Sequence, residues 1–484
     1  MKTVFVPHSR AAAPARAYEA TSTRPRVEDW TRELYGPNAA LDDSDYARAR
    51  AQDAIRNNPW INNALDLIVS HEIGCGIQPR PKIKDAGLRK ELVDLWNFSV
   101  PELDADGTSD FYAWQSLLSR AENESGEVFV RRRPRLPNDG LVVPIQFQAL
   151  EADLLPLRHN AMNDKNSIRQ GIERNPYGKR VAYWFYTEHP ADRSVTGNAF
   201  DLKPVPADQI AHHYTPLRPG QLRGEPKGIS ALLRARVMDG FEAAELDRRK
   251  ARAKFVGGIY RETEEENPVT DGSVTVEAQI ADREKQRAYV EIENAYLLSL
   301  APNERMVLEN GDTGGQNLLD FFRTQLRGMA AAWGVPYELM TGDYGGTNDR
   351  IMRVILNAFY RRLEIRQDRL VSQVLQPIWC WWLDAAVDFG VIRLSGYRVT
   401  DEARRAWQQC EWRAFDWSYV NPLQEVQTKV LKIKNGLSSQ SAEIAATGWD
   451  AEDVDQDNAN DQRRHQRLGL TYGDRSIAKS VEKP

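Results

Sequence analysis

The chain is poor in cysteine and has no long apolar run. Its cysteines, Cys75, Cys380 and Cys410, form no Cys-x-x-Cys pair and are too few and too scattered for a disulfide framework. Reduced thiols in a cytoplasmic setting are therefore expected. The longest apolar candidate, residues 61–68, is interrupted by polar side chains and falls far short of the ~20 residues that span a bilayer. We expect no membrane partner.

Motifs for nucleotide and metal chemistry are also missing. The sequence contains neither Gly-x-x-x-x-Gly-Lys-Ser/Thr nor Gly-x-Gly-x-x-Gly, the usual phosphate-cradling loops. His212 and His213 are adjacent, so on a strand they would face opposite sides and could not share a metal ion easily. The alternating acids from Asp453 resemble an EF-hand start, but Asn458 and Arg464 stand where that loop needs Gly and Glu. We expect no metal and no cofactor.

The charge balance excludes a strongly basic protein. The chain has 64 Lys and Arg against 69 Asp and Glu, a formal net charge of −5. A protein that grips nucleic acid over a broad surface would more often be basic, so any DNA contact must be local or weak. A length of 484 residues, with 41% hydrophobic and 27% charged residues, is typical of a soluble chain with two to four structural units.

Three long helices stand out, at about 229–255, 318–333 and 349–374. The first carries apolar residues at three- and four-residue steps, including Leu233, Val237 and Phe241, which predicts one apolar face. The first and third helices also have basic faces. Those on the first include Arg248, Arg249, Arg252 and Lys254. Such faces are either solvated or paired, or they contact DNA, and the pattern alone does not decide between these readings.

The remaining sequence alternates helical and stranded patterns, which predicts an α+β, helix-rich fold. Helices are expected from Ser44 to about His71 with a break at Asn58-Pro59, over 88–98, and after an N-cap at Asp110. Residues 126–215 have strand periodicity and predict one mixed or antiparallel sheet. Expected strands cover 77–84, 128–130, 142–147, 168–172, 181–186 and 210–214.

Glu151 and Asp153 are the one candidate catalytic pair. At i and i+2 they would share one face of a strand, as paired carboxylates for phosphodiester or glycoside cleavage. No partner His, Lys or third acid lies nearby in the sequence, so this enzyme reading is the weaker alternative.

A set of short motifs, in a fixed order over about residues 35–470, resembles the lambda-type portal proteins of tailed double-stranded DNA bacteriophages. Two of them, Gly126-Glu127-Val128-Phe129 and the run 218–224 (Arg-Pro-Gly-Gln-Leu-Arg-Gly), lie in the stranded region and just after it. The others are 56–59, 151–153, 171–173, 334–337, Asn421-Pro422 with Glu425, and Gly436-Leu437. Each motif is short, and the resemblance rests on their shared order and spacing.

The resemblance implies a portal fold with wing, stem, clip and crown regions, assembled as a ring. A flexible arm would cover 1–34, the wing 35–227 and 349–395, and the stem helices 228–256 and 316–335. The clip would be 257–315, the tunnel loop 336–348, and the crown and tail 396–484. Leu233, Val237 and Phe241 would pack subunits together, and Arg248, Arg249, Arg252 and Lys254 are candidates to line the channel. The DNA-facing loop residues would be Tyr337, Thr341, Asp343, Tyr344, Gly345, Gly346, Thr347 and Asn348.

The resemblance also implies a dodecameric ring at one capsid vertex, without catalytic activity. The ring would be the channel for genome packaging and ejection, in the virion and, during assembly, in the host cytoplasm. Its implied partners are double-stranded DNA, the large terminase subunit, the major capsid protein and a head–tail connector protein. The alternatives from other classes are the Glu151/Asp153 enzyme and a monomeric nucleic-acid-binding module that uses the basic helix faces.

Overall fold

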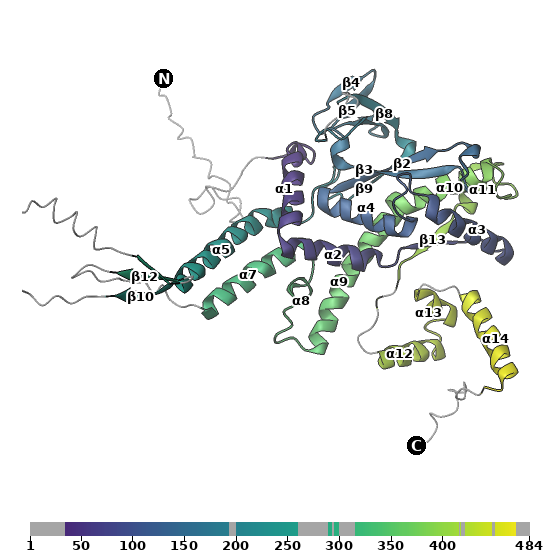
Figure 1. Ribbon diagram of the computed structural model, residues 1–484. Coiled ribbons are helices and arrows are strands. Elements are labelled where there is room, and N and C mark those ends of the chain that lie inside the picture. Colours follow the sequence, from purple (N-terminus) through teal and green to yellow (C-terminus); the bar gives the residue numbers. More distant parts are fainter. Residues whose placement is uncertain are drawn as a thin grey trace, which may run out of the picture.

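The computed structural model describes residues 34–192, 200–259, 289–292, 295–299, 315–415, 417, 422–447 and 451–470. In these residues a mixed body of helices and strands carries two long helices that project from it side by side (Figure 1). These paired helices are α5 (Ile229–Lys254) and α7 (Gly315–Trp333). The fold is α+β and helix-rich, as predicted.

The predicted break at Asn58-Pro59 separates α1 (Ser44–Asn57) from α2 (Pro59–Ile73). Asn58 is extended, and its side-chain oxygen accepts a hydrogen bond from the Ile61 N–H at 3.0 Å. Pro59 fills the first position of α2, where a missing N–H costs nothing because that group has no partner within the helix. Helix α2 then becomes the centre of the smaller core, which also includes residues of α5, α7 and α9.

The larger core lies between α3 (Ala86–Ser99), α4 (Phe111–Ser125) and α10 (Gln376–Asp388). Asp110 caps α4 by accepting from the Ala113 N–H at 2.8 Å, which confirms the predicted N-cap. Tryptophans dominate this core because each buries a large apolar ring. The fully buried ones are Trp96, Trp114, Trp379 and Trp382, and the rings of Trp96 and Trp382 lie 5.0 Å apart in an edge-to-face arrangement.

The third predicted helix is longer than expected. Helix α9 (Asp349–Leu370) continues through a π-helical turn at Val371–Leu375 directly into α10. Pro377, in the first turn of α10, has no N–H to donate to the helical hydrogen-bond pattern. The π-helical turn lies just before this proline. The helix therefore continues past the predicted end at 374 because the proline displaces the hydrogen-bond ladder instead of ending it.

The described residues between 126 and 215 form two antiparallel sheets instead of the single predicted one. Strands β2 (Glu127–Pro134), β3 (Ile145–Glu151) and β9 (Ile210–Tyr214) pair in the order β3-β2-β9. The other sheet is the meander β4 (Ala161–Asn163), β5 (Asn166–Arg169), β6 (Ile172–Arg174), β7 (Arg180–Tyr186) and β8 (Leu202–Pro206). A 3-10 turn at Ala152–Leu154 ends β3 and directs the chain into the second sheet. Residues 175–178 form the turn of the hairpin between β6 and β7.

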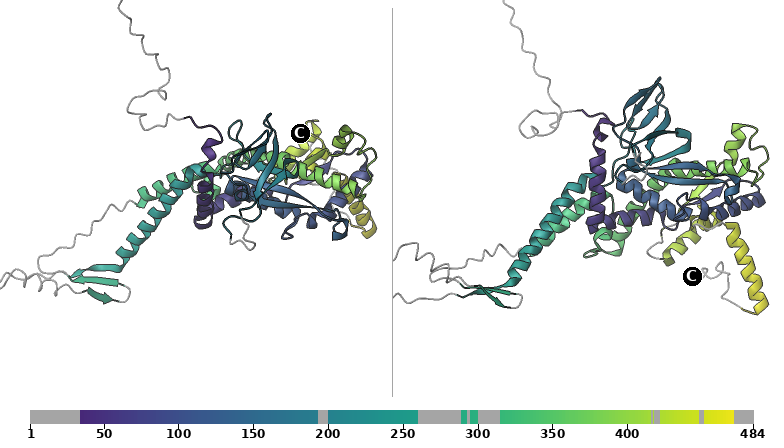
Figure 2. Two further views of the ribbon diagram at one scale, coloured as in Figure 1. Left: turned by 90° about the horizontal axis from the view of Figure 1, so that it is seen from above. Right: turned by 45° about the horizontal axis from the view of Figure 1, so that its top comes forward.

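Smaller elements complete the described chain. Strands β10 (Phe255–Ile259), β11 (Tyr289–Ile292) and β12 (Ala295–Ser299) form a sheet at the far end of the paired helices (Figure 2). Most of the predicted clip, 257–315, lies outside the described residues. The remaining 3-10 turns are Ala39–Leu41, Val100–Glu102, Pro137–Asp139 and Ala207–Gln209.

The C-terminal part divides in two. Helix α11 (Asp401–Trp407) is followed by β13 (Cys410–Arg413), which pairs with β1 (Gln78–Pro81) and joins the larger core. Helices α12 (Pro422–Lys434), α13 (Gln440–Ala446) and α14 (Ala451–Leu468) follow that strand. None of the helices in the described residues is both long and apolar enough to cross a membrane.

Candidate functional site

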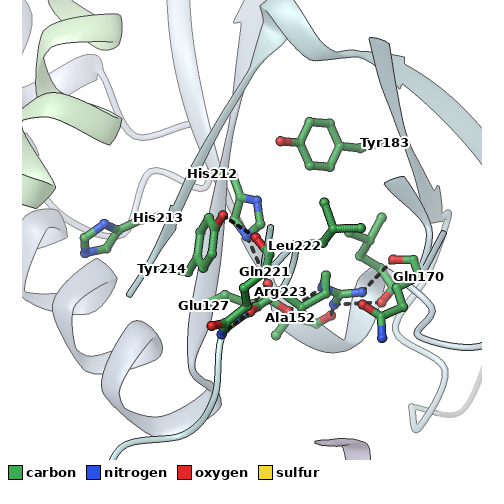
Figure 3. Close-up of polar contacts among 12 residues, drawn as sticks. Glu127, Ala152, Gln170, Tyr183, His212, His213, Tyr214, Gln221, Leu222 and Arg223 are labelled. Atoms are coloured by element: carbon green, nitrogen blue, oxygen red, sulfur yellow. Dashed lines mark hydrogen bonds and ion pairs between the residues drawn. The ribbon is translucent and has the colours of Figure 1, made fainter. Parts of the chain in front are cut away.

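Glu127, at the start of β2, is the centre of a buried ion cluster in which several sequence motifs meet (Figure 3). Its Oε1 accepts from Arg223 Nε at 2.7 Å and from Arg48 at 3.2 Å. Its Oε2 accepts from the Gly224 N–H at 3.1 Å and contacts His212 Nε2 at 2.9 Å. We call these four side chains, Glu127, Arg48, Arg223 and His212, the Glu127 cluster.

Arg223 uses its remaining N–H groups to connect the two sheets. It donates to the backbone oxygens of Gln170 at 2.8 Å, Ala152 at 3.1 Å and Leu155 at 3.0 Å. These acceptors lie in the chain that leaves β3 and in the turn before β6 (Figure 3). A single fully buried guanidinium therefore holds the 218–224 segment against both sheets, and its several N–H donors, directed at one carboxylate and three carbonyls, suit arginine and not lysine.

Two glycines permit the close approach of the motifs. Gly126 has a φ of +87°, and a Cβ added to it would overlap the backbone of Glu225. A Cβ on Gly224 would overlap the carbonyl of Gly126. The backbone of Gly126-Glu127 thus packs directly against the backbone of Arg223-Gly224, just before α5 begins. Both motifs therefore have a structural role.

Burial disfavours the charged forms of the side chains in the Glu127 cluster, and ion pairing between them offsets this cost. Burial alone would raise the pKa of Glu127, but the charges of Arg223 and Arg48 and the hydrogen bond to His212 outweigh it and hold the pKa well below its usual range. Burial lowers the pKa of His212 to about 3, despite Glu127 beside it. Burial likewise lowers the pKa of Arg223 to about 10, although Glu127 opposes the shift. At neutral pH the cluster therefore contains one carboxylate, two guanidinium groups and a neutral imidazole.

The candidate carboxylates Glu151 and Asp153 do not form a pair on one strand face. Glu151 ends β3, whereas Asp153 lies in the 3-10 turn that follows, so the alternation of a strand no longer applies. Asp153 pairs with Arg48 at 2.8 Å, and Glu151 pairs with His189 at 3.3 Å. The two carboxylates thus have different partners and do not contact a shared reacting centre, an arrangement that does not resemble a general acid–base dyad.

The histidine pair behaves as predicted. His212 turns toward Glu127, while His213 contacts Gln373 Oε1 at 2.8 Å on the other side of β9. Among the described residues, no group of three His, Cys, Asp or Glu side chains is placed to hold a metal ion.

The predicted packing residues of α5 lie on its outer side. Leu233 and Val237 are 78% and 65% exposed, respectively, while Ala231, Ala235 and Met238 face the smaller core. Phe241 is 41% exposed and also contacts the rings of Phe321 and Phe322 on α7, at 5.5 and 5.7 Å. With Ile229, these residues form a run at four-residue steps, which we call the α5 stripe: Ile229, Leu233, Val237 and Phe241.

The predicted channel-lining cations are partly neutralised. Arg248 and Arg249 both pair with Glu245, at 2.8 and 3.0 Å, within α5 itself. Arg252 and Lys254 belong to the last turn of the same helix, and their side chains lie outside the described part of the chain. On α9, Arg366 is not part of an open basic face, since it is largely buried and pairs with Glu72 and Glu122.

The predicted tunnel loop, 336–348, is only partly a loop. Tyr337 and Thr341 lie in a short helix, α8 (Tyr337–Thr341), so their assignment to a loop is wrong. Pro336 precedes the helix and Gly342, with a φ of +70°, ends it. The loop itself is 342–348, in which Asp343 contacts Arg323 of α7 at 3.2 Å and the Tyr337 hydroxyl at 3.0 Å. Asn348 ends it by capping α9.

The remaining loop residues are at the surface. Tyr344 is 52% exposed, and Gly345 donates its N–H to Asp343 at 3.1 Å. Gly346 has a φ of +76°, which only glycine adopts readily, and the Thr347 N–H closes the turn onto the Tyr344 carbonyl at 3.1 Å. The tip, 344–347, is thus the part of the segment that is free to meet another molecule.

Known proteins place this architecture in one class. The family model "Phage portal protein, lambda family" matches residues 23–367. The chain belongs to the lambda family of phage portal proteins. It is accordingly a virion component of the portal class. Membership of this family does not favour the alternative hypothesis of an enzyme that uses Glu151 and Asp153.

The chain is similar to individual phage proteins over most of its length. The chain is 24% identical over 445 residues to the "Probable portal protein" of Halomonas phage phiHAP-1, covering 88% of this chain and 82% of that one. It is 22% identical over 454 residues to "Portal protein B" of Escherichia phage lambda, covering 87% and 84%. A chain in the "Neck of empty GTA particle computed with C6 symmetry" has a TM-score of 0.44 and 16% identity, covering 87% and 97%. A chain in the "Virion of native gene transfer agent (GTA) particle" has a TM-score of 0.42 and 16% identity, covering 84% and 93%.

The Glu127 cluster is what inspection of the sequence missed. Its motifs were visible as separate runs, but not as partners, because Glu127 and Arg223 are 96 positions apart. One signal was available: both motifs join a glycine to a residue that is costly to bury, Gly126-Glu127 and Arg223-Gly224. A buried charge needs an opposite charge, and a glycine permits the close backbone approach that brings the two together.

Proposed function

We propose that about twelve copies of this chain close into a ring that conducts double-stranded DNA into and out of the capsid at one vertex. The α5 stripe carries the proposal, because Leu233 and Val237 are large aliphatic side chains that remain exposed on a projecting helix. A row of such residues marks a protein contact surface. A heterologous contact that repeats with rotational symmetry closes into a ring.

The regions of the ring follow from this proposal. The body over 35–227 and 349–395 would be the wing, α5 and α7 the stem, and 257–315 the clip. Residues 397–413 would join the wing, because Tyr397 and β13 pack into its core, and the crown would begin near α12. At ~1.5 Å per residue, α5 extends roughly 40 Å and would line a substantial part of the channel.

The charges of α5 suit a conduit. Each phosphate that a protein neutralises adds binding affinity through counterion release, so a strongly basic bore would retard DNA. Arg248 and Arg249 share the carboxylate of Glu245, which lowers the positive charge that they would offer to DNA. The net charge of the whole chain is −5. We infer that these cations guide DNA without holding it.

The partners in this proposal are a large terminase subunit, the major capsid protein and a head–tail connector protein. Terminase would drive packaging through the ring, and the connector would dock after packaging. Assembly would take place in the host cytoplasm before the ring becomes part of the virion.

Native mass measurement of the purified full-length chain tests the ring directly. We expect an assembly of about twelve subunits, since a heterologous interface that closes has a fixed copy number. A subunit that stays monomeric at every accessible concentration would contradict the proposal and favour the nucleic-acid-binding module.

The loop tip, 344–347, is the segment that we propose touches DNA. Removal of Gly345 and Gly346 should leave ring formation unchanged, because Asp343 and Asn348 keep their contacts at the two ends of the loop. Packaging should fall, measured as nuclease-protected DNA in particles when the variant replaces the parent chain in its phage. A two-residue deletion of 138–139, in the 3-10 turn between β2 and β3, serves as the control. Loss of the ring would mean that the loop is structural instead.

A further inference from the structure

A cavity of about 450 Å³ opens beside the α5 stripe. The first turn of α5, the end of α7 and the middle of α9 enclose it, together with the chain just before α5. Four cationic side chains line it, namely Lys227, Arg362, Arg366 and Arg369. Only two of its lining residues, Glu122 and Glu225, are acidic. The cavity is therefore suited to an anion.

One of the two acids, Glu122, is already committed to other donors. Glu122 accepts from Arg366 at 2.8 Å and from the Thr215 hydroxyl, also at 2.8 Å. Arg366 also contacts Glu72 at 3.1 Å, and Arg369 donates to Thr215 at 2.7 Å. Lys227 differs from these arginines. In the described part of the chain, its side chain is partly exposed and makes no hydrogen bond or ion pair.

The surroundings of Lys227 lower the pKa of its ammonium group. Burial and, to a lesser extent, the neighbouring charge of Arg366 lower its pKa to about 8, against the opposing effect of Glu122. A cation that is partly buried without a partner is costly, and an incoming carboxylate or phosphate would remove that cost.

Trp333 supplies a second unpaired donor at the same place. The residue is fully buried and lines the cavity, and its indole N–H has no acceptor among the described residues. Its Nε1 edge lies against Gly228, where an added Cβ would overlap it. Gly228 directly precedes α5, so the positive end of this long helix also faces the cavity.

The rim of the cavity indicates what covers it. Three large aliphatic residues surround the opening and stay exposed: Leu217 at 64%, Ile229 at 41% and Ile365 at 62%. Exposed aliphatic side chains favour a protein surface over a nucleic acid. Ile229 is also the first residue of the α5 stripe, so the rim is continuous with the surface that we propose joins neighbouring subunits.

We propose that this cavity receives the carboxylate of an Asp or Glu side chain from a second copy of the chain, bound by Lys227 and Arg362, with Trp333 in the cavity wall. The proposal rests on the ring proposed above. The ion pair would lie where α5 joins the body, next to the apolar contact made by the α5 stripe. A buried charge pair of this kind fixes the register of an interface.

Zero-length carbodiimide cross-linking tests the assignment, because it joins an amine to a carboxylate only where the two are in contact. Rings are assembled from isotopically light and heavy full-length subunits, digested, and analysed by mass spectrometry. We expect Lys227 to be linked to an Asp or Glu of a subunit with the other label. Lys179, in the exposed turn between β6 and β7, should show no link between subunits and serves as the control.

Substitution gives an independent measure. Lys227→Met should raise the subunit concentration needed for half-assembly by roughly 30-fold or more, as for loss of one partner of a buried interfacial pair. Lys227→Arg should restore most of it, and Lys179→Met should have no effect. Thermal unfolding of the isolated Lys227→Met subunit should match or exceed that of the parent, because a partly buried unpaired charge is removed.

The outcomes separate this proposal from the ring itself. Rings that form without any Lys227 cross-link between subunits would overturn the carboxylate assignment and leave the ring intact. Failure to form rings at all would overturn both. Protection of Lys227 from acylation in the isolated subunit by inorganic phosphate would assign the cavity to a free anion. Protection by a short DNA duplex alone would assign it to a DNA phosphate, and either result would overturn the second-copy proposal.

Discussion

Replacement of Glu127 by Gln is expected to destabilise the body by about 3–5 kcal/mol, because it leaves the buried guanidinium group of Arg223 without its paired carboxylate and Arg48 with Asp153 alone. Arg48 and Arg223 are both almost completely buried and both donate to the same carboxylate oxygen. An amide keeps the shape of the side chain but removes the negative charge. Since a typical folded domain is stable by only ~5–15 kcal/mol, soluble yield should fall sharply. Chemical unfolding of the isolated full-length subunit measures the effect.

Glu151→Gln is the matched control. Its carboxylate is half exposed and has a single partner, His189, so its loss should cost no more than about 1 kcal/mol. A comparable loss of stability in both variants would contradict the importance assigned to the Glu127 cluster. The same control addresses the enzyme alternative, because a cleavage activity that Glu151→Gln abolished would not fit a purely structural chain.

The Glu127 cluster also shows where sequence reasoning ended. Periodicity and capping residues predicted most helices, because those signals are local: Asp110 caps α4 and Asn58-Pro59 starts α2, as the sequence indicated. The cluster depends instead on which strands become neighbours. The β2–β9 register sets His212 opposite Phe129, and the 3-10 turn after Glu151 sends the chain into a second sheet. Neither event has a signature within a short window of sequence.

The predicted tunnel loop, 336–348, differs from the structure for another reason. The family resemblance implies a loop over the whole segment, yet residues 337–341 contain Glu, Leu and Met, which are good helix formers. Pro336 before them and Gly342 after them are the usual start and stop signals. The signal for α8 was thus present in the sequence and was overlooked. The position of Asp343 against Arg323 could not have been found this way, since it depends on how α7 packs.

Replacement of Leu233 by Asp should abolish the ring while leaving the subunit folded. Leu233 is 78% exposed in the single chain, so a charge there costs the monomer little. In the proposed ring the same position is desolvated against a neighbouring subunit, where an unpaired carboxylate costs several kcal/mol. The copies in a ring repeat this penalty at every interface, so assembly should fail cooperatively. Native mass measurement should detect subunits or small oligomers, with an unchanged far-ultraviolet circular dichroism spectrum.

Ala243→Asp provides the control on the same helix. Ala243 is exposed on α5 but lies outside the α5 stripe, so it adds an identical charge without entering the proposed contact. Rings should form normally with this variant. Phe241→Asp should be worse than Leu233→Asp for the subunit itself, because Phe241 also packs against Phe321 and Phe322 within the chain. If Leu233→Asp formed rings as readily as Ala243→Asp, the subunit contact would have to lie on another face of the paired helices.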